Sequence, residues 1–239
     1  MKIRKTNYAI GSGIQQDLER YQQKLIEKQN RFLNSRRSDL PPICEKNQIE
    51  IFQNLVPTSV LREIQKTMIG SDFEWTYNPD NTYLSGKDWY KHSNKELHFD
   101  DLKRDGFGNK FLFNHTWWYD GKSRGLPVTE DIQVLINKVK EKTDTLHLRR
   151  MKANMYTNQG KRIKYNAHVD HPSKNAFWTA VYHVNDCNGM TVLHDEEKDI
   201  YREIPQKENQ LIAFDGRIKH YGITQDDTAL RIVVNFLLQ

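Results

Sequence analysis

The chain has 239 residues, 28% of them charged, and a mean hydropathy of −0.83. This length fits one globular domain, or one domain with a helical extension, and no segment is apolar enough to span a membrane. The net charge of +5 and the pI of about 9.0 arise from lysines and arginines interleaved with acidic residues, so charge alone does not indicate a nucleic-acid partner.

The predicted compartment follows from the two cysteines, Cys44 and Cys187, and from the opening stretch MKIRKTNYAIGSG. That stretch lacks the apolar core of a signal peptide. A lone cysteine pair without an export signal favours reduced thiols over a disulfide. We therefore expect a cytoplasmic protein.

The first predicted element is an amphipathic helix over residues 14–34, and SDLPP at 38–42 then breaks the chain. We expect an N-terminal helical extension over residues 1–42 and a main domain over residues 43–239. The apolar stripe of this helix consists of Ile14, Leu18, Tyr21, Leu25 and Phe32.

Two further helices are predicted in the first part of the main domain. Thr58 or Ser59 is a candidate N-cap for one, and the other begins at Thr129. Each places apolar residues on one face: Leu61, Ile64 and Met68 in the first, and Ile132, Leu135, Ile136 and Val139 in the second.

Two strands are also predicted there, in QIEIFQNLV from Gln48 and in FNHTWWYD from Phe113. Residues 75–109 are polar and without a clear period. Loops of this length are often functional lids, so we expect substrate specificity to reside there and in the WWYD region.

After Leu146 the chain consists of short β-rich runs separated by turns, and helices followed by many strands indicate an α+β fold. In the first run, Met151 and Ala153 are expected to pack on the helices, while Asn154 and Tyr156 face the mouth of a barrel or sandwich. The runs are HLRRMKANMY, NAHVD, FWTAVYHVND, MTVLHD, IYREI, NQLIAFDG and LRIVVNFLL.

His168 and Asp170, in YNAHVDHP, are candidate metal ligands because residues two apart on a strand face the same side. A mononuclear non-haem Fe(II) site needs two histidines and one carboxylate. His220 in GRIKHYG is the best third ligand. A second His-x-Asp, HFD at 98–100, has no suitably spaced histidine and arginine after it, so we expect an exposed loop there.

Arg231 lies in the otherwise apolar run LRIVVNFLL, where Val233 and Asn235 share its face. A buried guanidinium is unfavourable unless an anion meets it. A dicarboxylate cosubstrate would supply that anion by forming a bidentate ion pair between one carboxylate and the guanidinium.

The ordered set His-x-Asp, His and Arg resembles the Fe(II)/2-oxoglutarate-dependent dioxygenases. RMKANMYTNQGKRIKYNAHVDHP (150–172) is similar to the stretch around the first two iron ligands of oxygen-sensing-type prolyl hydroxylases. TAVYHVND resembles their Thr-x-x-Tyr-Tyr-Leu-Asn strand, and NGMTV stands where they have a Gly-Gly turn. The resemblance covers about residues 146–239 and implies a double-stranded β-helix, or jelly-roll, core supported by N-terminal helices.

The resemblance implies that Fe(II) is held by the catalytic set His168, Asp170 and His220, and that Arg231 anchors 2-oxoglutarate. The chain departs from the family pattern at His183, where a tyrosine is usual, and at Asn158, which replaces the upstream cosubstrate tyrosine in an ungapped comparison. The further cosubstrate candidates are Asn154, Tyr156, Thr179 and His183, and Asn235 is a candidate for a hydrogen bond to the metal-bound water or to Asp170.

The activity implied is hydroxylation of a C–H bond by O₂, with release of succinate and CO₂. The expected substrate is a prolyl or other amino-acid residue, peptide-bound or free. One alternative is nucleobase oxidation or dealkylation. It is favoured by the pI and by NMY at 154–156, which resembles the Asn-x-Tyr motif of the nucleic-acid dealkylating branch. This alternative predicts a basic, aromatic groove near residues 75–125. The other is a non-catalytic metal-binding jelly roll, although Arg231 argues against it.

Overall fold

The computed structural model describes residues 44–78, 110–119, 122–170 and 176–239, together with Gln23 and Glu27. Apart from Gln23 and Glu27, the helix predicted over 14–34 therefore lies outside the described residues, as do the HFD motif and most of the long polar segment. None of the helices in the described part of the chain has the length and apolar character needed to cross a bilayer. Both cysteines are free thiols.

The described residues contain two α-helices, α2 (Thr58–Ile69) and α4 (Glu130–Thr143). The hydroxyl of Thr129 caps α4 by accepting a hydrogen bond from the backbone N–H of Ile132 at 3.4 Å, as predicted. The predicted cap of α2 is wrong, because Pro57 occupies the N-cap position without a side-chain bond. The apolar faces predicted for both helices are buried.

The strands form two antiparallel sheets. The smaller sheet has the order β10-β7-β8, and a 3₁₀ turn (Glu196–Lys198) joins β7 to β8. Its strands are β7 (Met190–Asp195), β8 (Ile200–Pro205) and β10 (His220–Ile223).

The larger sheet has eight strands in the order β1-β9-β6-β11-β5-β3-β2, with β4 paired to β3. Its most central strands, β6, β11 and β5, come from the runs that the sequence marks as strands after Leu146. The eight are β1 (Ile49–Phe52), β2 (Thr76–Asn78), β3 (Leu112–Tyr119), β4 (Lys122–Ser123), β5 (Leu148–Thr157), β6 (Trp178–His183), β9 (Gln210–Asp215) and β11 (Leu230–Leu238).

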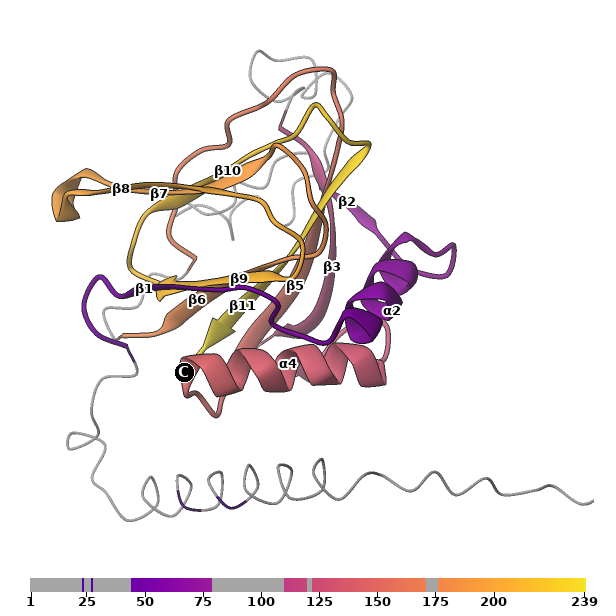
Figure 1. Cartoon of the computed structure of the whole chain (residues 1–239), viewed down its shortest axis with the longest axis horizontal. Coiled ribbons are helices and arrows are strands. Elements are labelled where there is room, and N and C mark those ends of the chain that lie inside the picture. The colour runs from indigo at the N-terminus through magenta and orange to yellow at the C-terminus, as the bar shows by residue number, and fades with distance from the viewer. Residues whose placement is uncertain (1–22, 24–26, 28–43, 79–109, 120–121, 171–175) are drawn as a thin grey trace, which may run out of the picture. The chain divides into compact units, whose positions relative to one another are not determined.

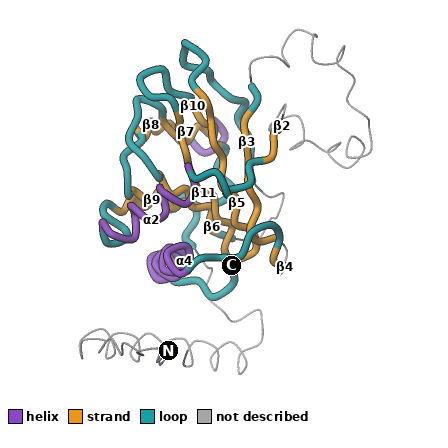
Figure 2. The backbone as a smooth tube through the Cα atoms, turned by 90° about the vertical axis from the view of Figure 1, so that its right-hand side faces the viewer, coloured by secondary structure: helices purple, strands orange, loops and turns teal. Residues whose placement is uncertain are grey.

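The elements stack in three layers, with α2 and α4 on one face of the larger sheet and the smaller sheet on the other (Figure 1). Figure 2 shows α4 end-on below the larger sheet and β7, β8 and β10 above it. One apolar core lies between helices and sheet and contains Met151 and Ala153, as predicted. The second core lies between the sheets and contains Val181 and Val233. The predicted α+β fold with a jelly-roll core is confirmed.

Strand β11 distributes its residues between these two cores by simple alternation. Ile232 and Val234 belong to the core against the helices. Arg231, Val233 and Asn235 face the other way and line a pocket between the sheets. The polar residues of this strand therefore face the space between the two sheets, where they can contact a ligand, and not the helices on the opposite face.

The strand predicted over residues 166–170 is wrong. Lys164 and His168 form only isolated bridges, to Ile223 and His220 respectively. The partner of this segment is β10, which is only four residues long and was not predicted. The segment thus runs beside the smaller sheet without adding a regular strand to it.

Gly216, which follows β9, is expected to tolerate no side chain. An alanine Cβ there would lie 1.9 Å from Cε2 of Phe177, a ring that is 1% exposed. The Gly216 N–H also donates to the Phe177 carbonyl at 2.8 Å, so the two residues cannot separate freely. We expect Gly216→Ala to lower the free energy of unfolding by about 1–3 kcal/mol or more, measured by chemical denaturation.

Adding Phe177→Leu to Gly216→Ala removes part of the ring and should recover part of the lost stability. A Gly216→Ala protein as stable as the wild type would contradict the packing described here.

Candidate metal centre and adjoining pocket

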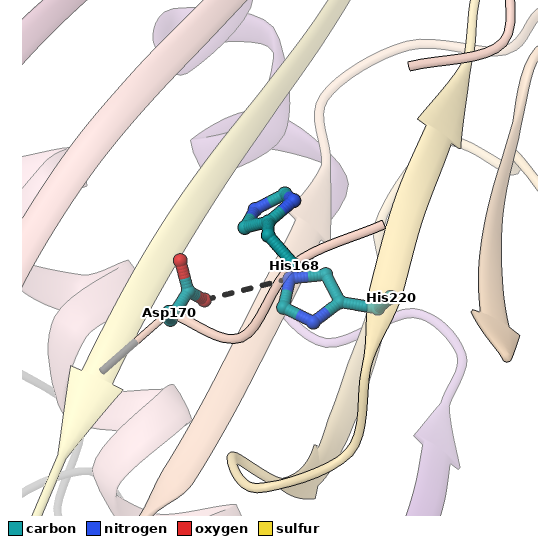
Figure 3. Close-up of side chains that lie close together, drawn as sticks. All are labelled: His168, Asp170 and His220. Atoms are coloured by element: carbon teal, nitrogen blue, oxygen red, sulfur yellow. Dashed lines mark ion pairs between the residues drawn. The ribbon is translucent and has the colours of Figure 1, made fainter. Parts of the chain in front are cut away.

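His168, Asp170 and His220 converge, and their ligand atoms all lie within 4.8 Å of one another (Figure 3). A reciprocal pair of backbone hydrogen bonds brings the two histidines opposite each other. The N–H of His168 donates to the carbonyl of His220 at 3.0 Å, and the reverse bond is 2.9 Å long. This pairing leaves the two imidazole centroids 4.7 Å apart.

Each histidine has its Nδ1 against a backbone carbonyl. His168 Nδ1 is 3.1 Å from the oxygen of Asn166, and His220 Nδ1 is 3.2 Å from the oxygen of Ile218. Since a carbonyl only accepts, Nδ1 carries the proton and the Nε2 lone pair is left for a ligand. Burial, with a contribution from His168, lowers the pKa of His220 to about 4, so this imidazole is neutral at pH 7.

The carboxylate of Asp170 lies between a cation and the imidazoles. Arg150 Nη2 donates to Oδ1 of Asp170 at 2.5 Å, and Oδ2 lies 3.6 Å from Nε2 of His220. Burial alone would raise the pKa of Asp170, but Arg150, His220 and His168 together hold it well below its usual range. The carboxylate is therefore ionised, and two imidazoles with one carboxylate form a donor set suited to Fe(II).

A pocket adjoins this cluster and encloses about 380 Å³, including space open to solvent. It lies between the inner face of the larger sheet and strand β10 with its neighbour β7. Its lining includes His168 and His220, so the pocket and the three-residue cluster form one site. The other lining residues are Asn154, Tyr156, Val181, Thr191, Tyr221, Gly222, Arg231, Val233 and Asn235.

Arg231 is 2% exposed, and no described acidic residue forms an ion pair with it. Its Nη2 donates to the Met190 carbonyl at 3.3 Å and to the Thr191 hydroxyl at 3.4 Å. Its guanidinium carbon lies 5.1 Å from the ring centroid of Tyr156. The cation is thus oriented by neutral groups within the described part of the chain, which leaves its charge uncompensated.

Several buried polar atoms on the inner face of the larger sheet have no hydrogen-bond partner among the described residues. They include Nε of Arg231, Oδ1 of Asn154 and Oγ1 of Thr179. Each such group is unfavourable by about 1–3 kcal/mol when left unpaired. A polar, anionic ligand in this pocket would satisfy the arginine and relieve part of that cost.

Comparison with known proteins gives matches to solved structures, whereas no family model and no curated protein sequence matches the chain. A prolyl hydroxylase from Trichoplax adhaerens, solved with a hypoxia-inducible-factor oxygen-degradation-domain peptide, aligns at 15% identity with a TM-score of 0.51, over 96% of this chain and 94% of that one. A 2OG-Fe(II) oxygenase-family oxidoreductase from Burkholderia pseudomallei aligns at 11% identity and a TM-score of 0.54, over 79% and 84%. The fold of the present chain is that of the 2OG-Fe(II) oxygenases.

A third neighbour shows how varied the chemistry on this fold is. The non-heme alpha-ketoglutarate-dependent epimerase from nogalamycin biosynthesis aligns at 9% identity and a TM-score of 0.51, over 81% of this chain and 78% of that one. A shared oxygenase fold therefore does not identify the substrate.

The oxygenase fold brings most of the predicted site residues together. His168, His220, Asn154, Tyr156, Arg231 and Asn235 all line the pocket, and Asp170 completes the cluster. Thr179 and His183 lie on the same face of β6 as Val181, which lines the pocket, but they are not themselves in its lining.

His183 lies behind the pocket wall. It is fully buried, and its Nε2 is 3.4 Å from the hydroxyl of Thr191, the same hydroxyl that Arg231 contacts. Burial, reinforced by the positive charge of Arg231, lowers the pKa of His183 to about 3, so it is neutral. Its place in the structure is that of a neutral support for the arginine.

Asn158 is exposed, and its side-chain amide donates to the carbonyls of Asp226 and Thr228 at 3.0 Å each. It therefore closes a turn away from the pocket, whereas Tyr156 lines the pocket. The position that an ungapped comparison selects is thus not the position that faces the site.

Sequence reasoning missed several residues of the site, and three of them contact its charged side chains. Thr191 contacts Arg231 by hydrogen bonding, and Gly189 lies against its side chain. Both are within NGMTV, a stretch that the family resemblance had marked only as a turn. Arg150 was not singled out, because no local signal connects it to Asp170, 20 residues away.

Proposed function

We propose that the protein is an Fe(II)- and 2-oxoglutarate-dependent dioxygenase that hydroxylates a C–H bond. The observation that carries the proposal is the buried guanidinium of Arg231, which has no acidic partner among the described residues and shares a pocket with the His168, Asp170 and His220 cluster. A non-catalytic metal-binding protein has no need for such a cation, so this feature favours turnover with a dicarboxylate cosubstrate.

In this proposal the Nε2 atoms of His168 and His220 and one oxygen of Asp170 would hold Fe(II). This arrangement leaves positions for 2-oxoglutarate and O₂. When bound, the iron, 2-oxoglutarate and O₂ supply an oxidation that converts the cosubstrate to succinate and CO₂ and a substrate C–H bond to C–OH.

The chain's own residues bind and orient the cosubstrate. Arg231 pairs with its distal carboxylate, and the Tyr156 ring packs against the guanidinium. Asn154 and Asn235 line the same pocket and supply further polar groups. His183 supports this wall from behind through the hydroxyl of Thr191, and Thr179 lies on the same face of β6 as the pocket residue Val181.

The substrate class that we propose is a prolyl or other amino-acid residue, peptide-bound or free. Support comes from the resemblance of residues 150–172 to prolyl hydroxylases and from the fold shared with a prolyl hydroxylase solved with a peptide. The nucleobase alternative expects a groove over residues 75–125, and most of that segment lies outside the described residues.

The experiment that tests the proposal is succinate release under air from the full chain with Fe(II) and 2-oxoglutarate. Proline-containing peptides, free amino acids and single-stranded oligonucleotides are compared as substrates. Stimulation by peptides or amino acids supports the proposed substrate class, and stimulation by oligonucleotides alone would replace it with the nucleobase alternative.

Gly189→Ala is expected to weaken 2-oxoglutarate binding without touching a ligand. The new Cβ would lie 2.7 Å from Cδ of Arg231 and 3.0 Å from the carbonyl oxygen of Ile223, so the arginine must shift. Since displacements of about 1 Å reduce activity by up to about 100-fold, we expect affinity for the cosubstrate to fall on the order of 10–100-fold. Titration calorimetry with the iron-loaded protein measures this.

The control is Gly160→Ala, at an exposed bend where an added Cβ meets nothing within 4 Å and no pocket residue has to move, so that the strain of alanine at its positive φ of 72° falls on stability alone. It should leave cosubstrate affinity unchanged. Equal affinities for Gly189→Ala and the wild type would show that Arg231 does not hold the cosubstrate in the way described.

A further inference from the structure

Arg150 is held by strand pairing on both sides, whereas Asp170 is not part of a strand. Arg150 lies on β5, paired with Leu237 of β11 on one side and Tyr119 of β3 on the other. Asp170 lies in a bend, two residues after the isolated bridge between His168 and His220. The histidines are fixed by their backbone pairing, but the carboxylate depends on side-chain contacts for its orientation.

The contact between the two is short and largely shielded from solvent. Arg150 Nη2 donates to Oδ1 of Asp170 at 2.5 Å, and the side chains are 18% and 8% exposed. A charge-assisted hydrogen bond in such surroundings is among the stronger polar contacts in proteins. The bond engages one carboxylate oxygen and leaves Oδ2 facing Nε2 of His220.

We propose that Arg150 is a positioning residue that orients Asp170 so that only Oδ2 is presented to the metal. This inference rests on the proposed function. With Oδ1 held by the guanidinium, the carboxylate occupies one coordination position and not two. The site then keeps the positions that 2-oxoglutarate and O₂ need.

A purely structural ion pair would predict something different. It would lower stability when broken, but the metal affinity and coordination of the folded protein would stay as they were. The discriminating readouts are therefore Fe(II) affinity, measured anaerobically against a competing chelator, and the visible absorption of the Co(II)-loaded protein, which reports coordination geometry.

The variants to compare are Arg150→Met, which removes the donor, and Arg150→Lys, which keeps the charge and one donor. Arg149→Met is the matched control, because Arg149 is the next residue on the same strand and its Nη1 donates to Gln239 Oε1 at 2.9 Å, away from Asp170. Unfolding of each metal-free variant, followed by circular dichroism, establishes that it is folded.

We expect Arg150→Met to bind Fe(II) about 10–100-fold more weakly than the wild type and to change the Co(II) spectrum. Arg150→Lys should recover part of the affinity, and Arg149→Met should match the wild type. If Arg150→Met does not fold, a partial loss in Arg150→Lys decides the question.

The inference would be overturned if Arg150→Met kept the wild-type Fe(II) affinity and an unchanged Co(II) spectrum. Tighter Fe(II) binding in this variant would also overturn it, because the arginine would then compete with the metal for Asp170. Failure of the wild type itself to bind Fe(II) would instead overturn the proposed function and the inference with it. The two failures are thus distinguishable.

Discussion

Replacing Arg231 with methionine is expected to weaken the affinity for 2-oxoglutarate severely while leaving the affinity for Fe(II) unchanged. The side chain is 2% exposed and points into the pocket beside the metal cluster. Removing one member of a buried charge pair costs about 2–5 kcal/mol, which corresponds to a loss of roughly 30-fold to a few thousand-fold in affinity. Calorimetric titration of the iron-loaded protein with 2-oxoglutarate measures the change.

The same substitution is expected to have no destabilising effect on the metal-free protein. Among the described residues the guanidinium has no acidic partner, so methionine removes an uncompensated buried charge and retains most of the volume. Replacing buried ions by apolar groups of similar size is often neutral or stabilising. Thermal unfolding of the Arg231→Met protein should therefore occur at or above the wild-type temperature.

Two controls sharpen the interpretation of Arg231→Met. Arg231→Lys keeps the charge but loses the planar fork, so its affinity should lie between those of the wild type and the methionine variant. Arg202→Met removes an exposed arginine of β8 and should change nothing. A protein that binds 2-oxoglutarate normally without Arg231, or that unfolds far more easily, would show that the arginine is a structural residue.

Single alanine substitutions at His168, Asp170 and His220 are expected to remove specific Fe(II) binding. Each substitution would delete one of three converging donors. Substitutions of residues that only hydrogen-bond to a metal ligand already reduce metal affinity by about 10–100-fold. We therefore expect losses above about 100-fold, together with loss of succinate release. Chelator competition under anaerobic conditions measures the affinity.

His147→Ala provides the control for these ligand substitutions, because His147 is exposed and lies outside the cluster. It should bind Fe(II) like the wild type. Retention of wild-type Fe(II) affinity in any one of the three ligand variants would remove that residue from the proposed metal site.

Local periodicity accounts for the parts of the fold that were predicted correctly. The helix faces and the alternation along β11 follow from residue spacing alone, so Arg231 and Asn235 were placed correctly opposite Ile232 and Val234. Periodicity gives the face of a strand but not its depth. His183 has the parity of the pocket wall, yet Thr191 from the smaller sheet lies in front of it.

The long-range contacts of the site were beyond a single sequence. His168 and His220 were predicted to act together, but through a regular strand, whereas the structure joins them by one reciprocal pair of backbone hydrogen bonds. Likewise, the bond from Arg150 to Asp170 depends on how β5 lies beside a bend of the chain. Such contacts are set by tertiary packing, which residue spacing does not encode.

The most direct test of the central claim is an anaerobic titration of the metal-free protein, first with Fe(II) and then with 2-oxoglutarate, followed by visible absorption. We expect a metal-to-ligand charge-transfer band that appears only when both are present. We also expect the band to be absent in His168→Ala and in Arg231→Met at the same concentrations. Binding of Fe(II) without any such band in the wild type would contradict the assignment of this pocket to 2-oxoglutarate.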